Sequence, residues 1–292
     1  MSPELQSSVV AAIRAARGNG FRIASVRPVS GGCIDAAWRI EGSGIRFFVK
    51  AGTGCADRFA AEADGLAALA RCPAFVIPDV VANGAGDDRD FLVLEWLEIG
   101  ASGDPGQLGE ALAELHSITL PRFGWHRDNY IGSTPQQNTP GDVWADFFRD
   151  CRLRPQLRLA ADNGAPELER AAGDLLAGLA VFFPGSQPAP ALLHGDLWRG
   201  NCGFSGGRPC LFDPAVYAGD PDSDLAMAEL FGGFSPDFFA AYRARRPGAG
   251  DDGDRRMLYQ LYHVLNHYNL FGGGYRDHAG RLIHALDRRL RS

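Results

Sequence analysis

The chain has 292 residues, of which 46% are hydrophobic and 22% are charged, enough apolar material for a sizeable buried core. Its formal net charge of −6 argues against proteins that bind nucleic acid or anionic membranes through a basic surface. No apolar run approaches the roughly 18 residues that span a bilayer, and the first residues lack the basic and apolar regions of a secretion signal. We therefore expect a cytoplasmic protein, monomeric or homodimeric, with neither nucleic-acid nor membrane partners.

The basic residues are divided very unevenly between the two types. Of the 29, 28 are arginine and one is lysine, Lys50. Arginine and lysine replace each other on a solvated surface, but not where a compact ammonium group is required. An Arg-rich codon preference explains the scarcity equally well, yet Lys50 is singled out as a candidate functional residue before any motif is considered. The six cysteines include no C-x-x-C pair, so reduced thiols are expected.

The first third of the chain has the pattern of a sheet with two helices. Apolar residues alternate along residues 33–41, which is typical of a half-buried strand, and recur at helical spacing after residue 59. Gly31 and Gly32 lie in a turn between the first two strands. We expect a helix near residues 9–16, strands at residues 21–29, 33–41, 45–50 and 91–97, and a helix from about residue 59 to 70.

The remainder is mostly helical. We expect helices at residues 108–117, 143–162 and 166–183, short strands at residues 191–194 and 209–212, helix again from about residue 224, and a long C-terminal helix from residue 255. This order predicts an α+β, two-lobed, protein-kinase-like fold. Residues 1–97 would form a β-rich N-lobe that binds the ATP phosphates. Residues 98–292 would form a mainly helical C-lobe with the catalytic loop and the metal and substrate sites.

The segment from His194 to Asn201, HGDLWRGN, has the polar residues that phosphoryl transfer needs. Asp196 and Asn201 lie five residues apart, as do the Asp and Asn of a kinase catalytic loop. Asp213 ends an apolar strand twelve residues later, where kinases place a second metal ligand. The spacing therefore predicts Asp196 as the catalytic base and Asn201 and Asp213 as Mg²⁺ ligands. The alternative for each residue alone is a helix cap or a turn.

The predicted N-lobe supplies the complementary groups for ATP. Backbone N–H groups at the Gly31-Gly32 turn could approach phosphates, although two glycines between strands are also typical of a simple hairpin. Lys50 ends a strand, as a phosphate-binding lysine does, and Glu62 twelve residues later could pair with it. Residues 94–97 resemble a hinge that offers backbone groups to adenine. The candidate ATP-binding residues are Gly31, Gly32, Lys50, Glu62, Glu95 and Leu97.

With these motifs the chain resembles the fructosamine (ketosamine) kinases, members of the aminoglycoside phosphotransferase and choline kinase superfamily. The resemblance rests on the segment 194–201, on Phe212-Asp-Pro-Ala-Val-Tyr217, and on three more stretches at residues 123–136, 219–227 and 259–275. It implies ATP-dependent phosphorylation of a sugar hydroxyl, the 3-OH in this family, on a ketosamine. The phosphorylated adduct then decomposes and frees the amine, so the family is associated with protein deglycation and repair.

The resemblance also implies roles for further residues. Trp198 would stack on the sugar or flank its amine. His267 is interpreted separately, with Asn266, as part of the substrate wall, and the alternative is a zinc site with His263, four residues earlier. The cosubstrate and cofactor would be ATP and Mg²⁺, and the ketosamine would be a small molecule or protein-bound. Arg199, where the family has Ser, is one departure from the pattern that leaves the exact sugar open. Oxidation of Cys33 near the phosphates is a possible redox switch, and a small residue at a strand start is the alternative.

Two other functions stay open at this point. A kinase of the same fold could act on an aminoglycoside or a choline-like amino alcohol. A catalytically inactive ATP-binding protein is more remote, because the base and both metal ligands are present. Asp220 and Asp224 are interpreted as residues that cap a helix and stabilise the C-lobe, and His116 as a buried histidine with its hydrogen bonds satisfied.

Overall fold

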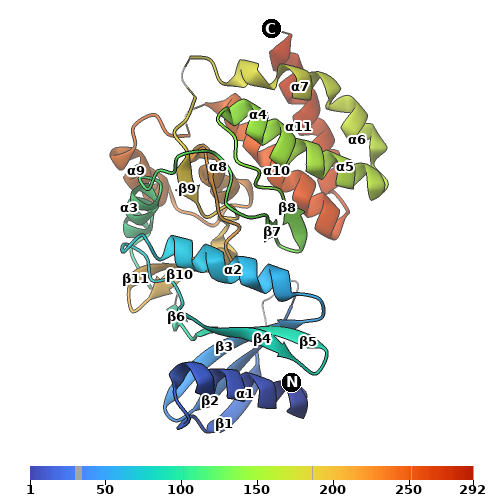
Figure 1. Ribbon diagram of the computed structural model, residues 1–292. Coiled ribbons are helices and arrows are strands. Elements are labelled where there is room, and N and C mark those ends of the chain that lie inside the picture. Colours follow the sequence, from blue (N-terminus) through green and yellow to red (C-terminus); the bar gives the residue numbers. More distant parts are fainter. Residues whose placement is uncertain (30–34, 101, 186, 251, 292) are drawn as a thin grey trace. The chain divides into compact units, whose positions relative to one another are not determined.

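The computed structural model describes residues 1–29, 35–100, 102–185, 187–250 and 252–291 (Figure 1). Gly31, Gly32 and Cys33, which carry the predicted phosphate turn and redox switch, lie outside the described residues. The chain forms two compact units, the first from residues 1–102 and 203–213 and the second from residues 103–202 and 214–292. The short segment 203–213 thus groups with the N-terminal part of the chain. The predicted division at residue 97 stays a prediction.

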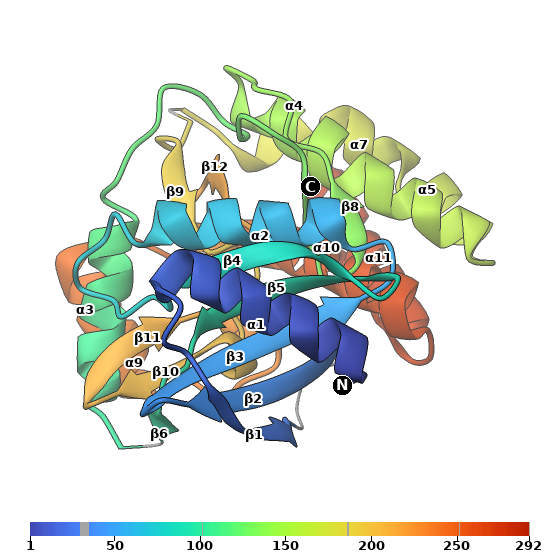
Figure 2. The same cartoon turned by 60° about the horizontal axis from the view of Figure 1, so that its bottom comes forward.

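The first unit is built on a five-stranded antiparallel sheet with the strand order β1-β2-β3-β5-β4. One face packs on helix α1 through residues such as Val49 and Val93, and the other packs on helix α2 through Leu92 and Leu94. Figure 2 shows the sheet between the two helices. The elements are α1 (Pro3–Arg17), β1 (Ile23–Pro28), β2 (Ala36–Gly42), β3 (Ile45–Gly52), α2 (Ala56–Leu69), β4 (Val80–Gly86) and β5 (Arg89–Glu95).

A small hairpin completes the first unit. Its strands β10 (Cys202–Ser205) and β11 (Arg208–Leu211) form a sheet with β6 (Ile99–Gly100) in the order β11-β10-β6. The backbone of Val76 bonds to this hairpin twice, donating to Pro209 O at 2.8 Å and accepting from Leu211 N at 3.2 Å. The hairpin is therefore held beside the segment that follows α2. Asp213 comes two residues after its last strand.

The second unit is mainly helical, so the predicted α+β class is confirmed. Among the described residues, no helix is long and apolar enough to cross a membrane. The helices are α3 (Pro105–Leu115), α4 (Trp144–Phe148), α5 (Arg154–Asp162), α6 (Pro166–Ala171), α7 (Gly173–Gly178), α8 (Asp222–Leu230), α9 (Pro236–Arg245), α10 (Gly253–Phe271) and α11 (Tyr275–Leu290). The short strands β7 (Asn129–Ile131) and β8 (Thr134–Gln136) form one hairpin, and β9 (Ala191–Leu193) pairs with β12 (Tyr217–Gly219).

The core of the second unit is rich in aromatic rings. Trp144 and Phe148 on α4 are fully buried against Tyr259 on α10. Trp144 Nε1 donates to the Tyr259 hydroxyl at 3.0 Å, and that hydroxyl donates to Asp220 Oδ2 at 2.5 Å. Because the indole N–H of Trp144 and the hydroxyl of Tyr259 both have hydrogen-bond partners, these rings hold α4, α10 and the start of α8 together without leaving either group unsatisfied.

Three predicted helices differ in detail from those observed. The helix at 143–162 contains a π turn at Arg149–Leu153, next to Pro155, which has no N–H to donate within an α-helix. The helix expected at 166–183 breaks into α6, α7 and a 3₁₀ turn at Leu179–Phe182. The C-terminal helix is interrupted at residues 272–274, where three consecutive glycines separate α10 from α11. The predicted strand 91–97 also ends early, at Glu95.

Candidate active site

Lys50 forms two ion pairs within the first unit. Its neighbours Val49 and Ala51 on β3 are buried on the α1 face, so strand alternation turns the Lys50 side chain toward α2. Nζ donates to Glu62 Oε1 at 2.8 Å and also to Asp213 Oδ1. Burial alone would lower the pKa of Lys50, but the charges of Asp213 and Glu62 outweigh it and raise the pKa above its ordinary value. The arrangement keeps a compact ammonium group charged.

Asp213 has an unusual backbone conformation. Its φ of 54° lies in the left-handed region, which few residues other than glycine adopt but which Asp tolerates better than most. The residue directly follows the segment that Val76 holds in place, and its side chain is about half exposed. Strained backbone of this kind persists where the surrounding structure enforces it, often at functional sites. The strain here presents the carboxylate to Lys50.

The start of α2 carries a second ion pair that the sequence did not single out. Arg58 donates to both carboxylate oxygens of Asp35, at 2.6 and 2.7 Å, and to Cys55 Sγ at 2.8 Å. Asp35 directly follows residues 30–34 in the chain, and Arg58 lies one helical turn before Glu62. A bidentate pair of this geometry has a fixed orientation. It therefore ties the start of β2 to the helix that carries Glu62.

The catalytic-loop candidates lie in the second unit. The buried strand β9 leads to His194 and then to Gly195, whose φ of 82° and close approach to Ala215 O, 2.0 Å from where a Cβ would stand, admit only glycine. Asn201 Nδ2 donates to Asp196 O at 3.0 Å and to Asp196 Oδ2 at 3.2 Å. The two predicted residues are thus in direct contact, and the hydrogen bond fixes which way the Asn201 amide faces.

Asp224 holds this loop by its backbone, a contact that stabilises the second unit and that the sequence did not specify. Its carboxylate accepts from the N–H of His194 at 2.7 Å and of Gly195 at 2.9 Å. His116 Nε2 lies 3.2 Å from the same carboxylate, and His116 Nδ1 lies 2.7 Å from the Tyr242 hydroxyl. Burial acts to raise the pKa of Asp224, but His116 and the loop N–H of Gly195 hold it below its ordinary value. His116 is buried and fully hydrogen-bonded, as expected.

Asp220, in contrast, has the predicted capping role. Its Oδ1 accepts from the N–H of Asp222 at 3.0 Å, at the first residue of α8. Sequence reasoning could not separate Asp220 from Asp224, because both are acidic residues next to the start of one helix. Asp224 differs because it lies within the helix, where its carboxylate can accept hydrogen bonds from the backbone of the loop that follows β9.

Trp198 and His267 differ in their surroundings. The Trp198 side chain is 37% exposed, and its ring lies over Gly200, where a Cβ would come within 2.2 Å. His267 on α10 is surrounded by aromatic rings, with centroids 4.5 Å away in Phe231 and 5.3 Å away in Tyr275. Phe231 is 41% exposed.

One hydrogen bond decides which nitrogen of the neutral His267 ring carries the proton. Its Nδ1 lies 2.8 Å from His263 O, which can only accept, so Nδ1 carries the proton and Nε2 is the acceptor. Burial lowers the pKa of His267. The ring is therefore neutral at neutral pH, with one acceptor nitrogen among aromatic rings.

The two hinge candidates, Glu95 and Leu97, lie at the end of β5 and just beyond it. Glu95 is the last residue of β5, and its backbone N–H already donates to Asp79 O at 2.8 Å. Leu97 lies two residues beyond the strand and is half-buried. The adenine-binding role of both residues stays a prediction.

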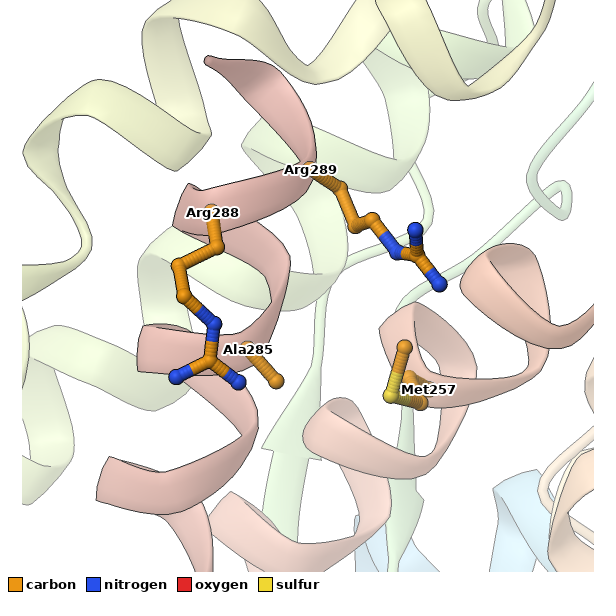
Figure 3. A pocket seen from close by; sticks show the side chains of 4 residues that line it. All are labelled: Met257, Ala285, Arg288 and Arg289. Carbon is orange, nitrogen blue, oxygen red and sulfur yellow. The ribbon is translucent and has the colours of Figure 1, made fainter. Parts of the chain in front are cut away.

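A hollow of about 310 Å³ elsewhere in the second unit has a different character. Figure 3 shows it between α10 and α11, lined by Met257, Ala285, Arg288 and Arg289. None of the predicted site residues borders it. Arg289 is paired with Asp254 at 3.1 Å. The hollow has no carboxylate or amide set of the kind that orients a nucleophile.

Comparison with known proteins gives a consistent set of matches. A family model described as fructosamine kinase matches residues 5–289. A protein of Synechocystis named as a probable ketoamine kinase is 39% identical, and the alignment covers 97% of both chains. The chloroplastic protein-ribulosamine 3-kinase of Arabidopsis thaliana is 37% identical over 91% of this chain and 83% of its own.

Solved structures agree with the sequence matches. A crystal structure from Thermobifida fusca, described as a candidate fructosamine-3-kinase, is 32% identical with a TM-score of 0.84 and covers 96% of this chain and 99% of its own. An aminoglycoside phosphotransferase is similar in fold alone, with a TM-score of 0.61 at 16% identity over 96% and 98% of the two chains. The predicted kinase-like fold is confirmed.

Proposed function

Because the chain belongs to the fructosamine kinase family, we propose that it transfers the γ-phosphoryl group of ATP to a sugar hydroxyl of a ketosamine. The observation that carries the proposal is the contact between Asp196 and Asn201 on the loop that Asp224 holds by its backbone. A base in kinases must be held in a defined orientation before it can accept the hydroxyl proton. The family match over residues 5–289 supports the substrate class.

The reaction assigns a separate task to each charged group. The acceptor oxygen forms the new bond to Pγ, its proton goes to Asp196, and the bond from Pγ to the bridging oxygen breaks to release ADP. Asn201 fixes the Asp196 carboxylate through the 3.2 Å hydrogen bond. Lys50, kept cationic by Glu62 and Asp213, offsets the negative charge of the phosphates.

The metal-ligand candidates fit Mg²⁺ by their chemistry. Asn201 Nδ2 faces Asp196, so its amide oxygen is the atom on the other side of the group, and Asp213 supplies a carboxylate. Mg²⁺ prefers such hard oxygen donors and keeps several waters and phosphate oxygens as its remaining ligands. Asn201 and Asp213 would hold the Mg²⁺, which when bound would offset the negative charge that develops on the phosphates.

The acceptor end of the substrate would lie near Trp198 and His267. A ketosamine carries a secondary amine that is protonated at neutral pH, and such a cation is attracted to aromatic faces. The neutral His267 ring offers an acceptor nitrogen beside Phe231 and Tyr275 without repelling a cation. The 3-hydroxyl is the acceptor that the family implies, and loss of the phosphorylated sugar would then free the amine.

The test is Mg²⁺-dependent release of ADP from ATP with ribulose-lysine and fructose-lysine as acceptors. We expect turnover with at least one of them, and a fall of about 10²–10⁴-fold in Asp196→Asn. Asp237→Asn, the same change at an exposed position on α9, is the matched control and should keep full activity. Turnover with aminoglycosides or other amino alcohols but none with ketosamines would contradict the proposed substrate.

A further inference from the structure

We propose that Gln136, together with Asn129, is a positioning residue that sets the catalytic loop through the backbone of residues 215–216. The inference rests on the proposed function, because it concerns the loop that carries Asp196. It gives a role to the hairpin of β7 and β8, which contains no residue of the proposed reaction.

The hairpin places two amide side chains side by side. Asn129 and Gln136 are cross-strand partners in the β7–β8 pair, and their side chains are 4% and 2% exposed. Asn129 Nδ2 donates to Val216 O at 2.7 Å. Gln136 Nε2 donates to Ala215 O at 3.1 Å and to Asn129 Oδ1 at 2.8 Å. Two buried amides thus bind two consecutive carbonyl groups of one extended segment.

That segment is in direct contact with the catalytic loop. The N–H of Ala215 donates to His194 O at 2.9 Å. The Ala215 carbonyl oxygen lies so close to Gly195 that a Cβ there would stand 2.0 Å from it. Ala215 is also only two residues after Asp213 in the chain. A displacement of the Ala215 carbonyl must therefore move the backbone that leads into Asp196.

The orientation of the Gln136 amide is itself fixed. The Tyr262 hydroxyl on α10 donates to Gln136 Oε1 at 2.6 Å, so the amide cannot turn over without losing this bond. Asn138 Nδ2 donates to Asn129 Oδ1 at 2.8 Å, and Arg152 in turn donates to Asn138 Oδ1 at 2.8 Å. A buried hydrogen-bond network of this kind favours one arrangement of its amides, since a wrong orientation leaves donors or acceptors unpaired.

A second buried glutamine, Gln156, is the control that distinguishes an effect on the catalytic loop from a loss of stability. Gln156 on α5 is 3% exposed, and its amide donates to Asn266 Oδ1 at 3.2 Å and accepts from Asn269 Nδ2 at 2.7 Å. These partners belong to α10, as does Tyr262, to which Gln156 also has a side-chain hydrogen bond, and none of them lies in residues 194–216. Replacing either glutamine by methionine keeps the side-chain length and removes its hydrogen bonds. Only the change at Gln136 would release the Ala215 carbonyl.

The experiment compares Gln136→Met with Gln156→Met in the full chain. We expect both variants to lower Tm by similar amounts. Gln136→Met should lower kcat by about 10–100-fold with little change in KM for ATP, because small misplacements of a catalytic group have effects of this size. Gln156→Met should retain at least half of the parent kcat. Equal kcat in the two variants would overturn the proposal.

Hydrogen exchange provides a readout that does not need turnover. Amides of residues 191–197 and 214–218 should exchange faster in Gln136→Met than in the parent and keep the parent rate in Gln156→Met. If no ketosamine is phosphorylated by the parent, the exchange result still decides the positioning role, so the two failures are distinguishable. Unchanged exchange in both segments would contradict it.

A milder variant covers the case in which Gln136→Met does not fold. Tyr262→Phe removes only the hydroxyl that orients the Gln136 amide. It should lower kcat by about 2–5-fold and raise the exchange rate of residues 214–218, a smaller version of the same effect. Parent kcat together with parent exchange in this variant would count against the proposal.

Discussion

Among single residues, Asp224 in the second unit is a buried carboxylate that accepts several hydrogen bonds at once. It is a carboxylate that is only 1% exposed, and its partners are two backbone N–H groups and a histidine ring. A carboxylate can accept all three hydrogen bonds because it has no proton to place. An asparagine has the same shape, but its Nδ2 would face an N–H donor and leave that donor unpaired.

We therefore expect Asp224→Asn to lower the free energy of unfolding by about 3 kcal/mol, the cost of a broken buried charge and an unsatisfied donor. Because the freed donors belong to His194 and Gly195, kcat should fall as well. Urea unfolding at pH 7.5 measures the first effect, and ADP release under native conditions measures the second. Asp237→Asn, on the exposed face of α9, should stay within about 0.5 kcal/mol of the parent. A variant at position 224 as stable as this control would disprove the assigned role.

At the level of an element, the start of α8 contains a carboxylate, Asp222, whose charged form is disfavoured in the folded protein. Asp222 Oδ1 accepts from the N–H of Gly250 at 2.9 Å, and Arg255 is 3.9 Å away. Burial, followed by the nearby charge of Asp220, raises the pKa of Asp222 from 3.8 to about 6. A carboxyl group whose pKa is raised by folding adds stability below its ordinary pKa, and this is lost as pH rises through about 6.

Asp222→Asn should remove this pH dependence while keeping an acceptor for Gly250. Relative to the parent, the unfolding free energy of the variant should rise by about 1.4 kcal/mol between pH 5.0 and 7.5, since the parent loses its raised-pKa contribution over that interval. Urea unfolding of both proteins at the two pH values gives the difference. Asp237→Asn, unfolded at the same two pH values, is the control for the substitution itself. A constant difference for Asp222→Asn would show that the carboxyl group has an ordinary pKa in the folded protein.

For the whole molecule, the sequence pattern predicted those helices and strands that depend mainly on residues close together in the chain. The α+β class followed from alternation at residues 33–41 and helical spacing after residue 59. The strand β4 was missed because its sequence, VVANGAG, does not alternate and contains poor strand formers. The break between α10 and α11 lies at three glycines, and α7 begins at Gly173, directly after the break at Ala172; how far such glycines interrupt a helix depends on the packing around them.

The candidate site was predictable only in part for the same reason. Asp196 and Asn201 are close in sequence, so their spacing indicated the contact that the structure contains. Lys50 was noticeable as the single lysine, and its pairing with Glu62 fits a strand followed by a helix. Asp224, Gln136 and the Arg58–Asp35 pair act through contacts between residues that are 23 to 79 positions apart. A local sequence pattern cannot predict contacts between residues so far apart in the chain.

The single lysine also has a consequence for the protein as a whole. Reducing sugars react with neutral amines, and Lys50 is both buried between two carboxylates and held cationic by them. The lysine side chain should therefore resist glycation. We expect no adduct on Lys50 after prolonged incubation with ribose, by intact mass and peptide mapping. A double variant, Arg71→Lys and Arg281→Lys, places lysines at two exposed positions and should gain up to two lysine adducts. An adduct on Lys50 in the parent would mean that its ammonium group is accessible and deprotonates readily, and the ion-paired role assigned to it would fail.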